Sequence, residues 1–372
     1  MKWKFYSLAF VAGMSILTAC SSDDNNDNDG NGGNGNGNEI ENGTILKGTI
    51  TSDVTLAAGN TYKLSGEYIV EEGATLHIEE GVKIIAVYDD IADYILVKQG
   101  GKINAVGTPD KPIVMTSEKE EPGAWGGIHI CGRAHTNAEG GKGSSEIGGA
   151  VYGGNDDADN SGTLQYIRLE YTGFAFDEEH EANGISFYGV GNVDHCQAYK
   201  GSDDGFEFFG GSVNVSNLVA VSCSDDSFDW TEGWNGKGTN LVAYQEDKST
   251  LGYDCDCLME CDNNGSNNAA TPVAHPVLKN LILVGNGGSK QGIRLRAGTE
   301  VEIDNAKVCG KGQPLTVETA LTENALKNGT SKLTNITLTS ELSSKEGIYT
   351  HADFIAVTSN KVDANLSYSS FE

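Results

Sequence analysis

The segment Asp203-Asp204-Gly205-Phe206-Glu207-Phe208 is followed, 22 residues further on, by the matching segment Asp225-Asp226-Ser227-Phe228-Asp229-Trp230. In both, large apolar residues alternate with polar ones, which is the two-residue period of a β-strand with one buried face. Residues 183–187 and 291–295 follow the same pattern. The residues expected to point inward are Ile185, Phe187, Phe206, Phe208, Phe228, Trp230, Ile293 and Leu295. The predicted outward row is Ser186, Glu207, Asp229 and Arg294.

A second motif, apolar-x-Asn-apolar, recurs through the same region. Its asparagines, which lie 23, 40, 25 and 30 residues apart, are Asn217, Asn240, Asn280, Asn305 and Asn335. A period in the twenties that is interrupted by loop insertions is typical of a solenoid built from short strands. Stacked asparagine amides can hydrogen-bond along such a stack. Residues 44–372 are therefore predicted to form an all-β, single-stranded parallel β-helix, with residues 311–372 as its C-terminal coils and cap.

The N-terminus has the features of an export signal. Two lysines precede an apolar run over residues 5–17, and small residues lead to a cysteine in Leu17-Thr18-Ala19-Cys20. This arrangement is typical of a secretory signal peptide, and the run is too short for a transmembrane helix. The cysteine segment resembles a bacterial lipobox, which implies that residues 1–19 are removed and that Cys20 is lipidated and anchors the chain to a membrane. Residues 20–43, rich in Asp, Asn and Gly, are expected to be a flexible tether.

Acidic side chains dominate the composition. The chain has 53 Asp and Glu residues against 25 Lys and Arg residues, for a formal net charge of −28. Such a charge repels phosphate backbones, so nucleic acid is not expected as a partner. The same field attracts divalent cations, and it opposes a polyanionic glycan unless a cation bridges the two.

The densest group of carboxylates falls on the two segments quoted first. Equivalent residues on adjoining coils stack about 4.8 Å apart, so Glu207 should lie beside Asp229 and repel it. Three interpretations remain open: a solvated acidic face, a Ca²⁺ site, since that ion prefers hard oxygen ligands, or the acid/base pair of a glycosidase. The candidate metal ligands in these segments are Asp203, Asp204, Asp225 and Asp226.

Two other places are candidate sites. The loop Asp157-x-Asp159-x-Ser161-Gly162 resembles the first half of a calcium loop, but position twelve is Arg168, which excludes a full EF-hand. Asp157 and Asp159 are therefore ligands of another kind of calcium loop or members of an Asx-rich turn. Trp234 is expected in a turn, either as a platform for a sugar or as an anchor of the loop.

Seven cysteines follow Cys20, and they are expected to form disulfides or to be buried thiols. Cys196 and Cys223 fall on predicted strands, where core packing explains them most simply.

Several stretches resemble the right-handed, pectin-lyase-like parallel β-helix lipoproteins and surface proteins common in Bacteroidetes. The matching stretches are Gly73-Ala74-Thr75-Leu76-His77-Ile78-Glu79-Glu80-Gly81, Gly123-Ala124-Trp125-Gly126-Gly127-Ile128, Val151-Tyr152-Gly153-Gly154-Asn155-Asp156, Asp159-Asn160-Ser161-Gly162 and Asp203-Asp204-Gly205-Phe206-Glu207-Phe208-Phe209-Gly210-Gly211. In addition, Cys20-Ser21-Ser22-Asp23-Asp24 resembles the acidic surface-export signal of such lipoproteins. The resemblance implies a right-handed β-helix that is lipid-anchored in the outer membrane and exposed at the cell surface. It implies no settled activity.

Our leading hypothesis for function is a non-enzymatic, surface-anchored protein that captures a glycan or small nutrient beside an outer-membrane transporter. The acidic residues Glu207 and Asp229, together with Trp234, would form the contact surface. A polysaccharide-cleaving enzyme, polygalacturonase-like or lyase-like, is the alternative. The residues that would carry its chemistry are Asp203, Asp225, Asp226 and Arg294. Their order resembles that of polygalacturonases, but the Gly-His-Gly segment of those enzymes is missing. A structural or adhesive surface protein is a third hypothesis.

Overall fold

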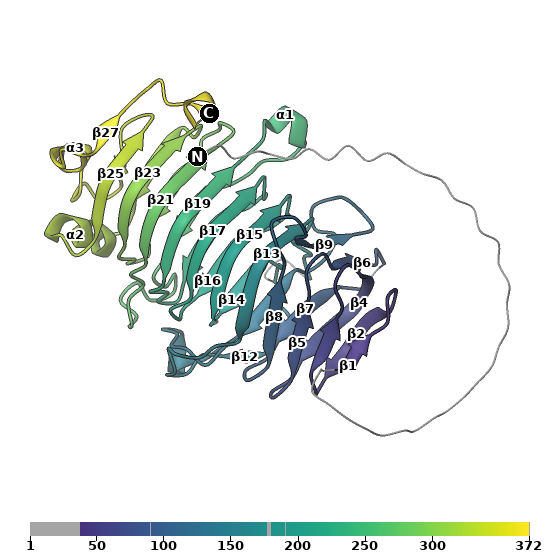
Figure 1. Ribbon diagram of the computed structural model, residues 1–372. Coiled ribbons are helices and arrows are strands. Elements are labelled where there is room, and N and C mark those ends of the chain that lie inside the picture. The colour runs from purple at the N-terminus through teal and green to yellow at the C-terminus, as the bar shows by residue number, and fades with distance from the viewer. Residues whose placement is uncertain (1–37, 90, 177–179, 190, 372) are drawn as a thin grey trace, which may run out of the picture.

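The computed structural model describes residues 38–89, 91–176, 180–189 and 191–371 (Figure 1). The predicted signal peptide, Cys20 and the tether up to residue 37 lie outside the described residues. The first strand, β1 (Asn38–Ile40), already pairs with β3 (Val54–Leu56), so the β-helix begins before the expected start at residue 44. In the described part of the chain, no helix is long and apolar enough to cross a membrane.

The chain winds into a parallel β-helix, as the repeat predicted, and the coil is right-handed, as the family resemblance implied. Figure 1 shows the coils stacked in chain order from the purple N-terminal strands to the yellow C-terminal ones. Among the described residues, 25 strands form one sheet in which each strand pairs in parallel with its equivalent on the next coil. The pairings divide the sheet into three sides, which we call the first, second and third faces.

The first face is made of short strands, one per coil. It begins with the second halves of β2 (Ile45–Ile50) and β4 (Thr61–Val70). It continues through β7 (Tyr94–Val97), β10 (Ile128–Cys131), β14 (Ile185–Tyr188), β16 (Phe206–Phe209), β18 (Phe228–Thr231), β20 (Met259–Cys261), β22 (Gln291–Leu295), β24 (Gln313–Val317) and β26 (Ser343–Ser344).

The second and third faces meet at a corner. In the first coils they are separate strands. The second face has β1, β3, β5 (Thr75–Ile78) and β8 (Lys102–Val106), and the third face has the first halves of β2 and β4, then β6 (Lys83–Ala86) and β9 (Ile113–Ser117). Later coils use one long strand for both faces. These strands are β13 (Gly162–Glu170), β15 (Asn192–Tyr199), β17 (Asn214–Val221), β19 (Lys237–Tyr244), β21 (Val277–Val284), β23 (Glu302–Cys309) and β25 (Lys332–Leu338), which is followed by β27 (Lys361–Val362).

Shorter elements lie in the connections between strands. They are the hairpin of β11 (Gly143–Ser144) and β12 (Val151–Tyr152), and the helices η1 (Glu139–Gly141), α1 (Lys248–Leu251), α2 (Ala320–Asn328), α3 (His351–Ala356) and η2 (Tyr368–Phe371). Leu326 of α2 and Phe354 of α3 pack into the main core, so these two helices cover the C-terminal coils.

The predicted inward residues form the core of the coil. All eight are at most 1% exposed, and their rings stack from coil to coil: the Phe187 and Phe208 centroids lie 5.0 Å apart, and those of Phe206 and Phe228 lie 5.6 Å apart. All seven cysteines of the described residues are buried free thiols, and Cys196 and Cys223 belong to the main core as expected. Apolar side chains therefore make up most of the interior, and no disulfide joins the described cysteines.

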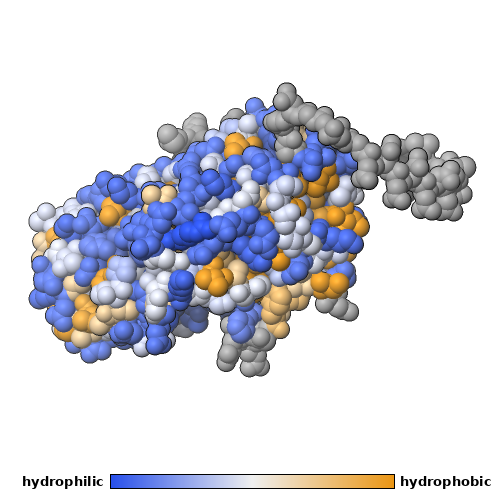
Figure 2. Space-filling view, turned by 90° about the horizontal axis from the view of Figure 1, so that it is seen from below, coloured by the Kyte–Doolittle hydropathy of each residue, from blue (hydrophilic) through white to orange (hydrophobic). Residues whose placement is uncertain are grey.

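The surface is mostly hydrophilic. Figure 2 shows one face covered by polar residues, with hydrophobic patches mainly toward the end that holds the N-terminal coils. More than half of the exposed large apolar side chains belong to the first 176 residues, namely Ile45, Tyr88, Ile91, Val106, Val151 and Phe176. The other four, Leu321, Ile355, Val362 and Tyr368, lie near the C-terminus, so among the described residues none falls between 177 and 320.

The five recurring asparagines lie at the corner between the second and third faces. Each of the five adopts a left-handed backbone, with φ between 55° and 64°, which asparagine tolerates better than other residues with a Cβ. The amide of Asn240 donates to Asn217 Oδ1 at 2.9 Å, that of Asn280 to Asn240 Oδ1 at 3.0 Å, and that of Asn305 to Asn280 Oδ1 at 2.8 Å. The predicted amide stack is confirmed. The stack ends at Asn305, because Asn335 on the next coil donates to Asp304 Oδ1 at 2.6 Å instead of to Asn305.

We expect Asn280→Ala to lower the free energy of unfolding by about 1–3 kcal/mol, because alanine pays the left-handed backbone cost and breaks two amide hydrogen bonds. Asn280→Gly should lose less, since glycine adopts that backbone without strain. Urea unfolding of the two variants beside the native chain measures both effects. An Asn280→Ala variant as stable as the native protein would show that the corner does not depend on this residue.

Candidate functional site

The outward side chains of the first face form a row that crosses the coils. In register, the row runs Ser186, Glu207, Asp229, Glu260, Arg294 and Thr316. The predicted neighbours Glu207 and Asp229 are confirmed. Glu260 was missed, because the segment that contains α1 lengthens this coil and breaks the period. The alternation Met259-Glu260-Cys261 was the signal that could have revealed it.

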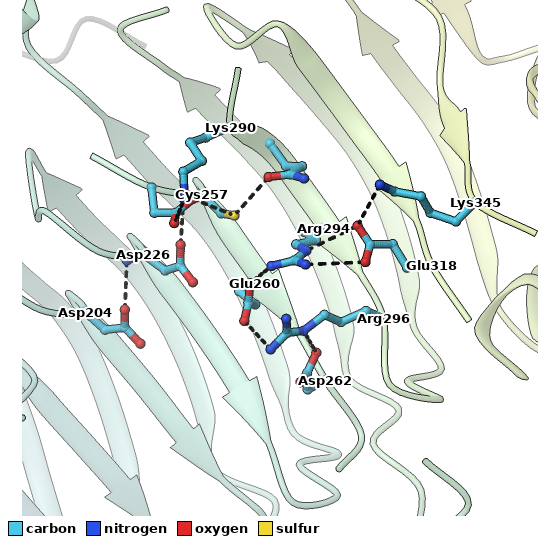
Figure 3. A network of polar contacts seen from close by, with 12 residues as sticks. Asp204, Asp226, Cys257, Glu260, Asp262, Lys290, Arg294, Arg296, Glu318 and Lys345 are labelled. Carbon is cyan, nitrogen blue, oxygen red and sulfur yellow. Dashed lines mark hydrogen bonds and ion pairs between the residues drawn. The ribbon is translucent and has the colours of Figure 1, made fainter. Parts of the chain in front are cut away.

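A second outward row lies three residues upstream of the first, at the turns that precede the strands. Asp204 and Asp226 occupy it, and each is 5% exposed. Asp204 Oδ1 accepts a hydrogen bond from the backbone N–H of Asp226 at 2.8 Å, and Asp226 Oδ1 accepts one from the N–H of Cys257 at 2.6 Å (Figure 3). Each carboxylate therefore ties its own coil to the next one and keeps its second oxygen for other partners.

We call the seven carboxylates of these coils the acidic strip. Its members are Asp203, Asp204, Glu207, Asp225, Asp226, Asp229 and Glu260. They form groups of three whose oxygens lie within 4.8 Å of one another: Asp203–Asp204–Asp225, Asp204–Glu207–Asp229 and Asp226–Asp229–Glu260. Asp226 also groups with Asp256 and Cys257. Such groups could hold a metal ion, since carboxylate oxygens are the ligands of hard cations.

The electrostatics of the acidic strip are unfavourable to charge. Burial, followed by the neighbouring carboxylates, raises the pKa of Asp203 to about 8 and that of Asp225 to about 6. The same causes raise the pKa of four other members well above the ordinary value, namely Asp204, Glu207, Asp226 and Asp229. In addition, Asp229 Oδ1 is buried and has no hydrogen-bond partner in the described part of the chain. These carboxylates are stable only if they are protonated or neutralised by a positive charge.

Two arginines neutralise one end of the acidic strip. Arg294 Nη1 lies 2.8 Å from Glu260 Oε1 and its Nε lies 3.3 Å from Glu318 Oε1. Arg296 Nη2 lies 2.6 Å from Glu260 Oε2, and its Nε lies 2.7 Å from Asp262 Oδ1 (Figure 3). Glu260 is thus balanced, whereas Glu207 and Asp229 lie further along the row.

The predicted catalytic set is only partly assembled. Asp203 and Asp225 belong to one group of neighbouring carboxylates. Asp226 follows Asp225 directly in the chain and belongs to another such group. Arg294 lies two coils beyond Asp229, roughly 10 Å away at the spacing of parallel strands, and its ion pairs are with other carboxylates. It therefore does not join the three aspartates as a single constellation.

Trp234 is not a sugar platform, and that expectation is wrong. The side chain is 1% exposed, its ring stacks on Phe208 with centroids 4.2 Å apart, and its Nε1 donates to the carbonyl of Val213 at 3.2 Å. The turn after β18 directs the indole into the core, so the alternative of a loop anchor is correct.

Asp157 and Asp159 act inside a turn. Asp157 Oδ1 accepts from the backbone N–H of His135 at 3.0 Å and lies 2.7 Å from His135 Nδ1, while Asp159 Oδ2 accepts from the N–H of Arg133 at 2.7 Å. This agrees with an Asx-rich turn, and neither residue belongs to a metal-capable group of the described chain. A calcium role for them stays a prediction.

Inserted segments cover the first face beside the acidic strip. Tyr152 and Ile147 from the segment around the β11–β12 hairpin, together with Ala182, pack on outward residues such as Leu96 and Tyr188. Tyr152 Oη donates to Glu232 Oε2 at 2.8 Å. From the same segment comes Glu146, whose pKa burial raises to about 7. Sequence reasoning missed Glu146 because it lies in an insertion outside the repeat.

The comparison with family models agrees with this architecture. The family model described as "Pectate-lyase like beta helix domain" matches residues 48–370. No curated protein matches the chain. Among solved structures, the chain is similar to the catalytic unit of a thermostable GH87 alpha-1,3-glucanase from Streptomyces thermodiastaticus strain HF3-3. The identity is 9% and the TM-score 0.31, and the match covers 79% of this chain but only 63% of the glucanase unit, so nothing about activity follows from it.

We expect the protein to lose stability between about pH 4 and pH 8 when divalent cations are chelated. A carboxyl whose pKa is higher in the folded than in the unfolded state stabilises the fold while protonated. This stabilisation is fully present below about pH 4, which is the pKa of an aspartate in the unfolded chain. It is lost as the pH rises through the folded-state pKa, about 6 for Asp225 and about 8 for Asp203.

The variant Asp203→Asn isolates this effect. In chelator, it should melt at a higher temperature than the native protein at pH 8 and at nearly the same temperature at pH 4. Glu302→Gln is the control. The ion pair of Glu302 with Lys332 at 2.8 Å lowers the pKa of Glu302, so this variant should melt at a lower temperature than the native protein at pH 8. An Asp203→Asn variant that is less stable than the native chain at pH 8 would refute the assignment.

Proposed function

The chain belongs to the pectate-lyase-like β-helix family, and from that premise we propose that its acidic strip binds a carbohydrate through a divalent cation. The proposal depends most on the surroundings of Asp229. This residue belongs to two groups of three carboxylates, and none of the described residues forms a hydrogen bond with its buried Oδ1. A cation between these groups would supply positive charge beside Glu207 and would add to that of Arg296 beside Asp229.

Ca²⁺ is the cation that the ligands favour. It takes six to eight oxygen ligands and tolerates irregular geometry, whereas Mg²⁺ demands an octahedron. The groups around Asp229 offer carboxylate oxygens within 4.8 Å of one another. Ligand positions left over would go to water or to the oxygens of a sugar.

The surface around the strip supports a carbohydrate as the ligand. The tryptophans that could stack on a sugar ring are buried, with Trp125, Trp230 and Trp234 each at most 1% exposed, so recognition would be polar. Carboxylates and arginines along one face can hydrogen-bond sugar hydroxyls in several orientations. A bound cation would also let an anionic sugar approach a chain with a net charge of −28.

The cellular setting is proposed from the sequence alone. We propose that Cys20 anchors the chain in the outer membrane by its lipid, that the β-helix faces the outside of the cell, and that it delivers a glycan or small nutrient to a transporter. The lipobox-like segment and the acidic residues after Cys20 support this setting. These residues lie outside the described part of the chain.

A polysaccharide-cleaving enzyme is the second candidate, and one observation favours it. Oxygens of Asp203 and Asp225 lie in one group within 4.8 Å, and their pKa values are raised to about 8 and about 6. Two neighbouring carboxyls with separated pKa values are the arrangement of a general acid and its partner in glycoside hydrolysis.

For the cation, we expect isothermal titration of the chelator-treated protein with Ca²⁺ to show binding and the melting temperature to rise with Ca²⁺. Asp229→Asn should weaken binding by more than about tenfold, the loss that follows even from removing a hydrogen-bond partner of a metal ligand. Glu302→Gln, an acidic residue of another face, should bind like the native protein. Native protein that shows neither heat nor a melting shift would exclude the cation.

For the ligand, the native protein should retain oligosaccharides on an affinity column in Ca²⁺ and release them in chelator. Incubation with a panel of neutral and anionic glycans, followed by assays for reducing ends and unsaturated products, separates binding from cleavage. A binding protein leaves the panel intact. Cleavage that disappears in Asp225→Asn would establish the second candidate instead.

A further inference from the structure

A chain of hydrogen bonds lies buried next to the acidic strip. It begins at His129 of β10, which pairs in register with Ser186 of β14, and both side chains are fully buried. His129 Nε2 lies 2.7 Å from the carbonyl oxygen of Gly126. A carbonyl can only accept, so Nε2 carries the proton. Burial lowers the pKa of His129 to about 4, and the ring is therefore neutral with Nδ1 as an acceptor.

The direction of every later bond follows from that proton. Ser186 Oγ lies 3.1 Å from His129 Nδ1 and must donate to it. The hydroxyl is then free to accept from Asn183 Nδ2, which lies 3.0 Å away. The same nitrogen donates its other hydrogen to Glu207 Oε2 at 2.6 Å. His129 and Ser186 thereby fix which end of the Asn183 amide faces Glu207.

In this orientation, the remaining polar atom of the Asn183 side chain is its amide oxygen, Oδ1. Asn183 is 1% exposed, and its Oδ1 has no hydrogen-bond partner among the residues that the structure describes. The two end atoms of an amide are about 2.2 Å apart, given its bond lengths. Because Nδ2 lies 2.6 Å from Glu207 Oε2, Oδ1 lies no more than about 5 Å from that carboxylate oxygen. A buried carbonyl without a partner costs about 1–3 kcal/mol, so a cation bound at this oxygen would offset that cost.

We propose that Asn183 Oδ1 is a neutral oxygen ligand of the cation held by Glu207, and that His129 and Ser186 are positioning residues that keep it pointed there. Asparagine carbonyls serve Ca²⁺ beside carboxylates, and a neutral ligand adds coordination without adding repulsion. Outer hydrogen-bond partners of this kind orient ligands at many metal sites. The inference rests on the proposed function, because it requires that the strip bind a cation.

Calorimetric titration with Ca²⁺ tests it on four variants. Ser186→Ala frees the amide to rotate and should weaken binding by roughly tenfold, within the range for lost outer partners. Asn183→Ala should weaken it at least as much. Asn183→Asp keeps an oxygen at the position but loses the donor to Glu207, so it should retain native affinity or exceed it. Thr316→Val, a fully buried hydroxyl on the same row beyond Arg294, is the matched control and should bind like the native protein.

The outcomes separate the two proposals. Native protein that binds no Ca²⁺ overturns the proposed function. If the native protein binds but Ser186→Ala and Asn183→Ala bind equally well, only the role of Asn183 is wrong. If Asn183→Asp loses affinity as Asn183→Ala does, Asn183 supports Glu207 by its hydrogen bond and is not a ligand. Melting curves in chelator show that each variant is folded before it is titrated.

Discussion

The in-register stacking of successive coils is the constraint on which the rest of this structure depends. Parallel strands lie about 4.8 Å apart, so a residue on one coil must find a favourable neighbour at the same position on the next. On the inside, apolar rings meet this condition: Phe187 lies on Phe208, and Phe206 lies on Phe228. On the outside, the outcome depends on the chemistry of the side chain that is repeated.

Asparagine and carboxylate rows show the two outcomes. An amide carries both a donor and an acceptor, so the stack of Asn217, Asn240 and Asn280 satisfies itself by bonds of 2.9 and 3.0 Å. Ionised carboxylates only accept, and a row of them needs protons, cations or arginines. At Glu260, the next coil supplies Arg294 and Arg296. At Glu207, the described chain brings further carboxylates, and at Asp229 it brings further carboxylates together with the charge of Arg296. This excess of negative charge is the reason why we propose a cation site here.

The repeat made much of the fold predictable. The alternation around Phe206 and Phe228 predicted both the core and the outward row, and the spacing of the asparagines predicted their amide stack. The same register placed Glu207 beside Asp229 correctly. These features could be predicted because they depend only on the period of the chain.

What could not be predicted comes from insertions and from the path of turns. Glu260 was hidden by the insertion before β20, and Glu146 comes from a segment outside the repeat. The turn after β18 sends Trp234 into the core, although its sequence context suggested exposure. The bond from Asn183 to Glu207 joins neighbouring coils and is set by His129, 54 positions earlier in the chain. Local sequence carries no signal for such a connection.

The central claim is that a cation sits among the carboxylates of adjoining coils. Anomalous diffraction from crystals soaked in Mn²⁺, a substitute for Ca²⁺ that scatters strongly, tests it most directly. We expect an anomalous peak within coordination distance of Asp229, between Asp204 and Glu207 on one side or Asp226 and Glu260 on the other. Fully soaked crystals with no peak at the acidic strip would contradict it.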